Sequence, residues 1–291
     1  MWYSVSMAGW RLWCTVPFAL NVGAESRPFL REVRETPPKP GEIDRVLELY
    51  PVENLPFFAE EGGVWQENRC YRRRDQVQEV FYCAAPGRSP YARVTWDLSA
   101  PQRLLCHYVL GQEKELNTFR NIFQLFSGET LLLELGGLML HASFIRWQGQ
   151  GILFSAPSGV GKSTQADLWA WCCQAEVLNG DRAALRPGPD GWRAYGLPYA
   201  GSSGIYRNEH APVAAIVLLG QAKENSIRRV SPAQALCALF PEVSKQGWDP
   251  LWTNRVLELL TKLVTQVPVY RLECLPDPSA VDCLKAALQL Q

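Results

Sequence analysis

The sequence has no excess of charge of either sign. Its 291 residues include 29 lysines and arginines and 29 aspartates and glutamates, so the formal net charge is zero. Binding to nucleic acid or to an anionic membrane surface usually relies on a strong positive field, which this composition does not supply. The run Arg72-Arg73-Arg74 is interpreted as a solvated strand or turn. We therefore expect neither nucleic acid nor membrane as a partner.

Paired cysteine motifs are also missing, although nine cysteines are present. The cysteines are scattered and odd in number, no two form a C-x-x-C pair, and no histidine stands at the spacing of a zinc site. This pattern favours reduced thiols in the core of a protein. We predict a cytoplasmic location, because thiols stay reduced there.

Long uninterrupted apolar runs are absent as well. The N-terminal segment is aromatic, but Arg11 and alternating polar residues interrupt it, so we do not expect a secretory signal. The most apolar stretch, 130–145, is too short to span a bilayer and contains Glu134 and His141. The sequence predicts no membrane segment.

The pattern of the chain changes near residue 112. Before it, short runs rich in aromatic and β-branched residues alternate with proline and glycine, which is typical of strands. After it, apolar residues over 115–126 recur at helical spacing, and 137–147 and 152–156 are predicted as strands joined by a tight glycine turn. Strands interleaved with helices indicate an α/β domain. We predict a smaller, mostly β N-terminal domain (1–112) of unknown role and an α/β domain (113–291).

One loop in the second domain carries recognisable chemistry. Residues 154–164 read F-S-A-P-S-G-V-G-K-S-T, with an apolar strand before the loop and a helical pattern after it. Glycines let such a loop turn tightly, so that its main-chain N–H groups point at phosphate oxygens. Lys162 would reach the β- and γ-phosphates, and the hydroxyl of Ser163 would bind Mg²⁺. The helix that opens at Lys162 directs its positive dipole end toward the anion.

The loop predicts ATP and Mg²⁺ as ligands. The residues expected to bind the nucleotide are Ser158, Gly159, Val160, Gly161, Lys162, Ser163 and Thr164. The loop departs from the strict motif at Ala156, where the first glycine is expected. Only the backbone angle at this position can decide how much the departure matters.

Phosphoryl transfer also needs a carboxylate at the end of a neighbouring strand. Asp181, in A-E-V-L-N-G-D-R (175–182), is the candidate for the catalytic carboxylate and for a metal ligand beside Ser163. The alternative is that Asp181 is a turn residue, because Asn, Gly and Asp are also residues that favour a turn.

These residues together resemble the HPr kinase/phosphorylase family, whose fold is related to the nucleotide domain of phosphoenolpyruvate carboxykinase. The likeness covers about 115–291. It rests on P-S-G-V-G-K-S (157–163), on the strand-turn-strand L-M-L-H-A-S-F-I-R-W-Q-G-Q-G (138–151), and on the acidic residue after the following helix. The resemblance implies a P-loop kinase domain with a mixed sheet and flanking helices. It also implies a homo-oligomer.

The resemblance assigns roles to two residues. It implies that Asp181 accepts the hydroxyl proton or helps to hold Mg²⁺, and that His141 lies beside it as a second catalytic residue that tunes its charge. The alternative is that His141, flanked by apolar residues on a strand, is a hydrogen-bonded core residue. Family members carry two adjacent aspartates, whereas Gly180 precedes Asp181 here. The segment Y-G-L-P-Y-A-G-S-S-G-I-Y-R (195–207) replaces a second family signature. It either lines the acceptor site, with Arg207 available for transition-state charge, or is a plain glycine loop.

Three functions remain open at this stage. The first is an ATP-dependent kinase that phosphorylates a serine-type hydroxyl of a protein or peptide. The second is a kinase of a small hydroxyl metabolite, which would need a compact pocket beside Asp181. The third is a nucleotide-binding regulatory module, in which the missing second aspartate marks lost catalysis.

Overall fold

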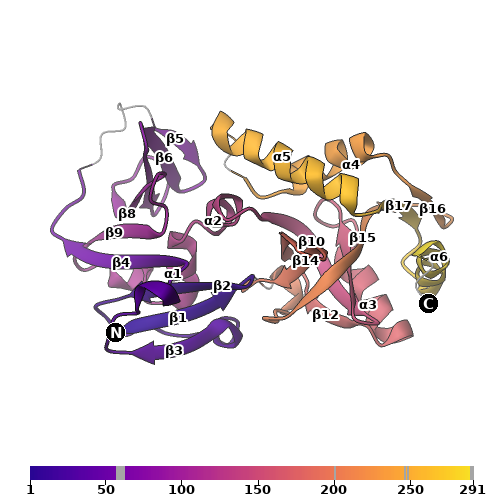
Figure 1. The fold of residues 1–291 in the computed structure, drawn as a ribbon, viewed down its shortest axis with the longest axis horizontal. Coiled ribbons are helices and arrows are strands. Elements are labelled where there is room, and N and C mark those ends of the chain that lie inside the picture. The colour runs from indigo at the N-terminus through magenta and orange to yellow at the C-terminus, as the bar shows by residue number, and fades with distance from the viewer. Residues whose placement is uncertain (57–62, 200, 246, 248, 289–291) are drawn as a thin grey trace. The chain divides into compact units, whose positions relative to one another are not determined.

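The computed structural model describes residues 1–56, 63–199, 201–245, 247 and 249–288. The described chain separates into two compact units, Met1–Gly128 and Glu129–Gln291. Each unit contains a mixed β-sheet and helices, so the architecture is mixed α/β (Figure 1).

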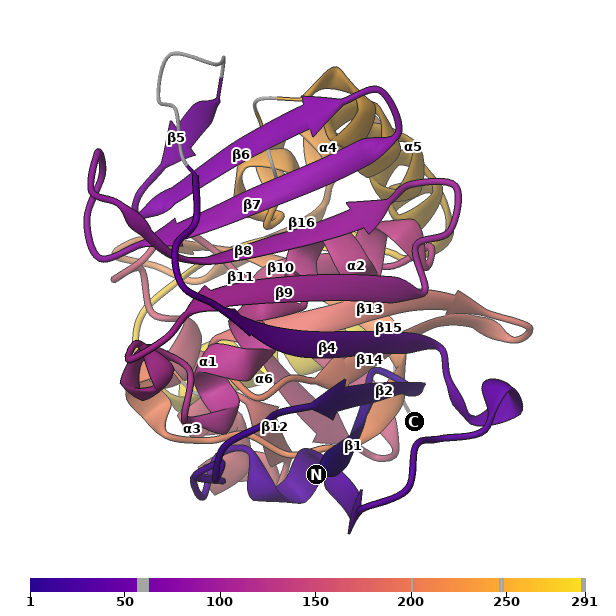
Figure 2. The ribbon, with the colours of Figure 1, turned by 90° about the vertical axis from the view of Figure 1, so that its left-hand side faces the viewer.

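The N-terminal unit is built on one twisted sheet, whose strands lie side by side in Figure 2. Its order is β3-β1-β2-β4-β9-β8-β7-β6-β5. The strands are β1 (Trp2–Met7), β2 (Trp10–Thr15), β3 (Leu30–Arg34), β4 (Arg45–Val52), β5 (Val64–Gln66), β6 (Arg69–Arg74), β7 (Val77–Cys83), β8 (Pro90–Asp97) and β9 (Arg103–Val109). Single 3-10 turns are η1 (Arg27–Phe29), η2 (Pro40–Glu42) and η3 (Glu113–Glu115).

Most neighbours in this sheet are antiparallel, but β4 runs parallel to both β2 and β9. The aromatic and β-branched runs predicted as strands correspond to β1, β2, β6, β7 and β8. The two strands at the centre, β4 and β9, were not predicted. Their central place follows from pairing along both edges, of β4 with β2 and β9 and of β9 with β4 and β8.

Helix α1 (Phe119–Leu125) closes this unit. The prediction of one buried helical face over 115–126 is confirmed, because its apolar residues are buried. The helix begins later than the pattern because the Thr118 side chain accepts a hydrogen bond from the Asn121 N–H and so caps it.

The C-terminal unit contains the predicted phosphate loop. Its strands are β10 (Leu138–Trp147), β11 (Gln150–Ser155), β12 (Glu176–Asn179), β13 (Arg182–Gly188), β14 (Gly191–Gly196), β15 (His210–Gln221), β16 (Ser226–Arg229) and β17 (Val269–Cys274). Its helices are α2 (Gly128–Glu134), α3 (Lys162–Cys173), α4 (Pro232–Leu239), α5 (Pro250–Gln266) and α6 (Pro278–Leu288), with 3-10 turns η4 (Gly201–Ser203) and η5 (Phe240–Glu242).

Strand direction decides which loops meet in this unit. The predicted hairpin is confirmed: β10 and β11 pair antiparallel around the turn Gln148-Gly149, where both residues have positive φ. On its other edge β10 pairs antiparallel with β12, so β11 and β12 run in the same direction. β15 is parallel to β11, and β17 is parallel to β15. The carboxyl ends of β12, β11, β15 and β17 therefore lie at one edge of the sheet.

Helix α3 follows the loop and packs on this sheet. Its Trp169 is buried among Phe154 of β11 and Trp147 of β10, with ring centroids 6.4 and 5.1 Å away. Helix α6 joins the same cluster through Val281 and Leu284. The helices α4 and α5 lie on the other side of the strands (Figure 1).

Replacing Trp169 with alanine is expected to lower the free energy of unfolding by about 3–5 kcal/mol, because a large side chain leaves a cavity in a packed core. The same helix offers a matched control, since Trp171 is 75% exposed. Trp171→Ala should change stability by about 0.5 kcal/mol or less. Thermal unfolding of both variants measures the difference, and equal losses would contradict this account of the core.

No helix in the described part of the chain combines the length and apolarity needed to cross a membrane.

Candidate functional site

The phosphate-type loop joins the end of β11 to the start of α3. Gly159 and Gly161 have φ of +82° and +121°, which side chains rarely adopt, while a Cβ at either position would meet open space. The backbone angle therefore requires glycine at both positions. Ala156 is not among the described residues with positive φ. Its backbone needs no glycine, so this departure from the motif does not distort the loop.

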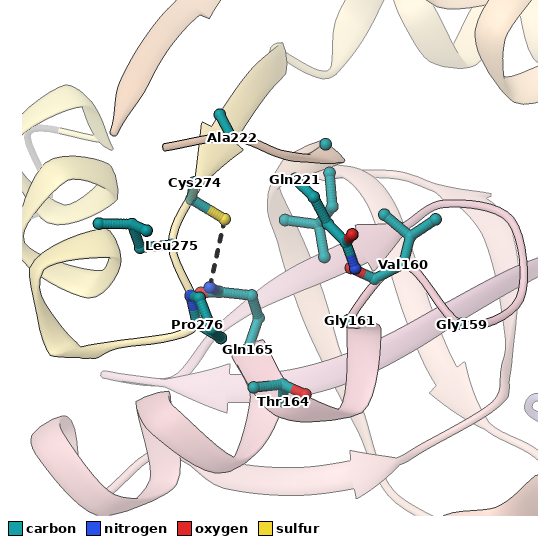
Figure 3. A pocket seen from close by; sticks show the side chains of 12 residues that line it. Gly159, Val160, Gly161, Thr164, Gln165, Gln221, Ala222, Cys274, Leu275 and Pro276 are labelled. Atoms are coloured by element: carbon teal, nitrogen blue, oxygen red, sulfur yellow. Dashed lines mark hydrogen bonds between the residues drawn. The ribbon is translucent and has the colours of Figure 1, made fainter. Parts of the chain in front are cut away.

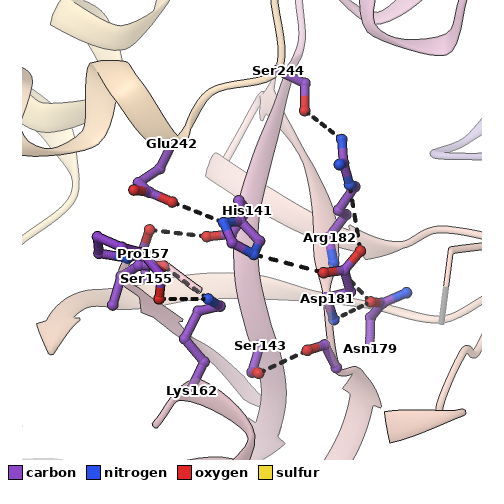
Figure 4. Close-up of polar contacts among 12 residues, drawn as sticks. His141, Ser143, Ser155, Pro157, Lys162, Asn179, Asp181, Arg182, Glu242 and Ser244 are labelled. Carbon is purple, nitrogen blue, oxygen red and sulfur yellow. Dashed lines mark hydrogen bonds and ion pairs between the residues drawn. The ribbon is translucent and has the colours of Figure 1, made fainter. Parts of the chain in front are cut away.

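Lys162 folds back over the loop from the first turn of α3. Its Nζ donates hydrogen bonds to the carbonyl oxygens of Ala156 at 2.8 Å and Pro157 at 3.2 Å (Figure 4). The residue is only 8% exposed. Burial lowers the pKa of its ammonium, while the negative charges of Glu242 and Asp181 act in the opposite direction. Lys162 thus lies within the electrostatic reach of two carboxylates.

The other predicted loop residues surround this lysine. Ser158 and Thr164 are exposed, and Ser163 is half-buried at the start of α3. Val160 accepts a hydrogen bond through its carbonyl oxygen from Nε2 of Gln221, at 3.3 Å. The end of β15 is thereby tied to the loop.

Asp181 lies just beyond β12, at the same sheet edge as the loop. The buried side chain of Asn179 fixes the turn, because its Oδ1 accepts hydrogen bonds from the N–H groups of Asp181 and Arg182 at 2.8 and 2.9 Å. The carboxylate of Asp181 lies 3.4 Å from Nε of Arg182. Its side chain is about a quarter exposed, at 28%. The carboxylate is therefore accessible from solvent.

His141 stands on β10, the strand between β11 and β12. Its neighbour Ala142 is paired with Ser155, the last residue of β11, and His141 itself is paired with Arg182. The Oγ of Ser155 also donates a hydrogen bond to the His141 carbonyl oxygen, at 3.0 Å. The Nε2 of His141 lies 3.6 Å from Oδ1 of Asp181. The structure therefore brings these two predicted residues together.

A second carboxylate, which the sequence analysis missed, faces the same histidine. Oε2 of Glu242 lies 2.8 Å from Nδ1 of His141, and the Glu242 side chain is 13% exposed (Figure 4). Backbone contacts hold it there, because Val243 forms a β-bridge with Leu140 and Ser244 donates its N–H to the Met139 carbonyl oxygen. One imidazole therefore links two carboxylates from distant parts of the chain.

The segment 195–207 passes close to Asp181, although Ala200 lies outside the described residues. Gly201 has φ of +55°, and a Cβ there would lie 2.7 Å from Cβ of Asp181, so only glycine fits. Arg207 lies 3.6 Å from a carboxylate oxygen of Glu176 and 4.0 Å from one of Glu209. Arg207 is therefore paired with the carboxylates of Glu176 and Glu209.

The described residues offer few protein ligands for a metal ion at this site. The described residues contain no group of three or more histidine, cysteine, aspartate or glutamate side chains that could hold a metal ion. The predicted Mg²⁺ ligands, Ser163 and Asp181, offer hard oxygen atoms. Mg²⁺ that enters with a nucleotide needs only one or two protein ligands of this kind, because phosphate oxygens and water complete its shell.

A comparison with protein-family models matches residues 106–276 to the SynChlorMet cassette protein ScmC. The match covers more than half of the 291 residues. The chain belongs to the ScmC family. The matched residues include the loop, His141, Asp181 and Glu242. No curated protein matches it.

The assignment to the HPr kinase/phosphorylase family is therefore wrong. Its three supporting features are local ones: a glycine-rich turn, a hairpin before it and an acidic residue after the next helix. Chains of different families can share such local features. The closeness of His141 to Asp181 does not depend on that family, because it rests on the distance of 3.6 Å between their side chains.

Proposed function

We propose that this protein is an ATP-dependent kinase with a P-loop kinase-type domain, which transfers phosphate to a serine-type hydroxyl of a protein or peptide. One observation carries the proposal: the phosphate-type loop and Asp181 follow two strands that run in the same direction, with His141 between them. In open α/β sheets, ligands bind at the carboxyl ends of the strands. A cytoplasmic location is part of the proposal, because ATP is abundant there and the nine free thiols would stay reduced.

The loop would hold the phosphates. Its main-chain N–H groups and the N-terminus of α3 attract the anion, and Lys162 is near enough to exchange its two carbonyl partners for phosphate oxygens. Mg²⁺ would be held by Ser163 and Asp181, and when bound it would neutralise charge on the phosphates. The ammonium of Lys162 would stabilise the charge that develops on the transferred group.

Asp181 would receive the proton of the acceptor hydroxyl. As that proton moves to the carboxylate, the hydroxyl oxygen bonds to the γ-phosphorus and the bond from phosphorus to the bridging oxygen of ADP breaks. His141 contacts Asp181 on one side and Glu242 on the other, so it would orient the carboxylate. Glu242 also weakens the alternative of a regulatory module, because that idea rested on a missing second carboxylate.

Glu242→Gln is expected to lower kcat for phosphoryl transfer about tenfold or more, with little change in KM for ATP. The amide keeps the shape of the side chain but removes the charge beside His141, so the contact that positions His141 and Asp181 weakens. Steady-state kinetics of wild type and variant measure both constants. Glu258→Gln, at an exposed position of α5, is the matched control and should leave both constants unchanged. A rise in KM with unchanged kcat would contradict the positioning role.

The acceptor class can be tested directly. The protein is incubated with radiolabelled Mg-ATP and a cell extract, and the products are separated by size. Label in a protein or peptide is the expected result, and acid-stable label on serine would identify the hydroxyl. Label in a small molecule would replace the acceptor with a metabolite. ATP binding without any labelled product would instead favour the regulatory module.

A further inference from the structure

A cavity lies beside the phosphate-type loop, on the side away from β12. It measures about 360 Å³, which falls within the range of small-molecule sites. Three parts of the chain form it: the loop with the first turn of α3, the end of β15 at Gly220–Ala222, and the end of β17 at Cys274–Pro276 (Figure 3). These three segments follow parallel strands of the same sheet.

The walls of this cavity suit a neutral, flat and largely apolar group. Val160, Leu219, Leu275 and Pro276 supply apolar surface, and none of the described residues that line the cavity carries a charged side chain. Burial raises the pKa of Cys274, so its thiol stays protonated and neutral. Phosphates would find no cation among these walls, whereas the loop next to the cavity would hold them.

One polar group in the cavity wall lacks a partner. Gln165 is only 2% exposed, and its Nε2 lies 3.4 Å from Sγ of Cys274. Its buried Oε1 has no hydrogen-bond partner among the described residues. An unpaired buried acceptor destabilises a fold, so it gains free energy when a ligand supplies an N–H group.

We propose that this cavity binds the adenine base of ATP, and that Oε1 of Gln165 accepts a hydrogen bond from the exocyclic amino group of adenine. The proposal rests on the nucleotide binding proposed above and adds where the base lies. The bound molecule would then follow the sheet edge, with its base at β15 and β17, its phosphates at the loop after β11, and its γ-phosphate toward Asp181 after β12. Guanine carries an oxygen where adenine carries the amino group, so Gln165 would disfavour it.

The test compares three probes: Mg-ATP, Mg-GTP and inorganic tripolyphosphate with Mg²⁺. Calorimetry should show that the wild type binds ATP at least about tenfold more tightly than GTP, the factor expected when one buried hydrogen bond is lost. The wild type should also bind ATP more tightly than tripolyphosphate, because only ATP has a base that fills the cavity. Gln165→Leu keeps the approximate size of the side chain and should remove the preference for ATP over GTP, while tripolyphosphate affinity stays unchanged.

A second pair of variants tests the cavity at an exposed position, so that the result does not depend on replacing the buried Gln165. Ala222 is exposed at the mouth of the cavity, so Ala222→Phe should fill the mouth without disturbing the fold. Ala222→Phe should weaken the binding of ATP at least about tenfold and leave the affinity for tripolyphosphate unchanged. The control, Ala222→Ser, should bind both probes like the wild type.

Four results would overturn the proposal. Equal affinity for tripolyphosphate and ATP would contradict binding of the base in the cavity, but would still be consistent with binding of phosphates at the loop. A preference for GTP, or a preference for ATP that survives Gln165→Leu, would contradict the role of Gln165. Failure of all three probes to bind would reject the loop and the cavity together.

Discussion

Lys162→Ala is expected to weaken Mg-ATP binding at least about a hundredfold, which corresponds to roughly 3 kcal/mol, because a charge-assisted hydrogen bond to phosphate is lost from the loop. The ammonium lies over the loop and is held by two carbonyl oxygens, so it is already close to the place where phosphates would bind. Calorimetry with Mg-ATP measures the loss. Unchanged affinity would refute the phosphate-loop interpretation.

The same variant should fold normally. Burial holds the pKa of Lys162 below its ordinary value in the folded protein, so the folded state binds this proton less tightly than the unfolded chain does. The resulting penalty to folding is absent at pH values above the unfolded pKa and fully present at pH values below the folded pKa. Removing the ammonium therefore removes a term that opposes folding, and the thermal midpoint of Lys162→Ala should not fall markedly.

Lys245 offers a matched control for this experiment. Its Nζ also donates to two backbone carbonyl oxygens, those of Phe240 at 2.8 Å and Val243 at 3.4 Å, and burial lowers its pKa as well. It differs from Lys162 in lying outside the loop. Lys245→Ala should therefore keep its affinity for ATP, and a similar loss in both variants would indicate a general effect of removing a half-buried lysine.

Local sequence patterns predicted the parts of the site that local geometry determines. The apolar strand before the loop and the helix that opens at Lys162 are confirmed as β11 and α3. The glycines at 159 and 161 were recognisable because the backbone angle there leaves no other choice. The same locality explains the wrong family, because features set by a tight turn before a helix do not distinguish one family from another.

Features that depend on long-range pairing could not be predicted in this way. Glu242 is separated from His141 by 101 residues, and F-P-E-V-S contains no motif that would mark it. Its place follows from the bridge between Val243 and Leu140. The cavity beside the loop likewise needs the ends of β15 and β17, which only the strand order brings together. The apolar run at 213–219 lies within β15, and its residues alone do not indicate which strands lie beside it.

Asp181→Asn is expected to lower the rate of phosphoryl transfer by about a hundredfold to ten-thousandfold, the range typical for loss of a general base. The amide keeps the shape of the side chain, and Asn179 binds only the main chain of this turn, so the turn should be preserved. An amide cannot take up the proton of the acceptor hydroxyl. Transfer is measured with radiolabelled ATP, and a normal rate would exclude Asp181 as the essential carboxylate.

Nucleotide binding by the same variant separates the two roles of Asp181. If Asp181 only accepts the proton, Asp181→Asn should bind Mg-ATP like the wild type and lose transfer alone. If it also holds Mg²⁺, the variant should need more Mg²⁺ for half-maximal ATP binding, because one of two protein oxygen ligands has lost its charge. Asp167→Asn, at an exposed position on α3, makes the same change in net charge near the loop. That control should leave binding, Mg²⁺ dependence and transfer unchanged, so a loss confined to Asp181→Asn would follow from its place beside His141 and not from charge alone.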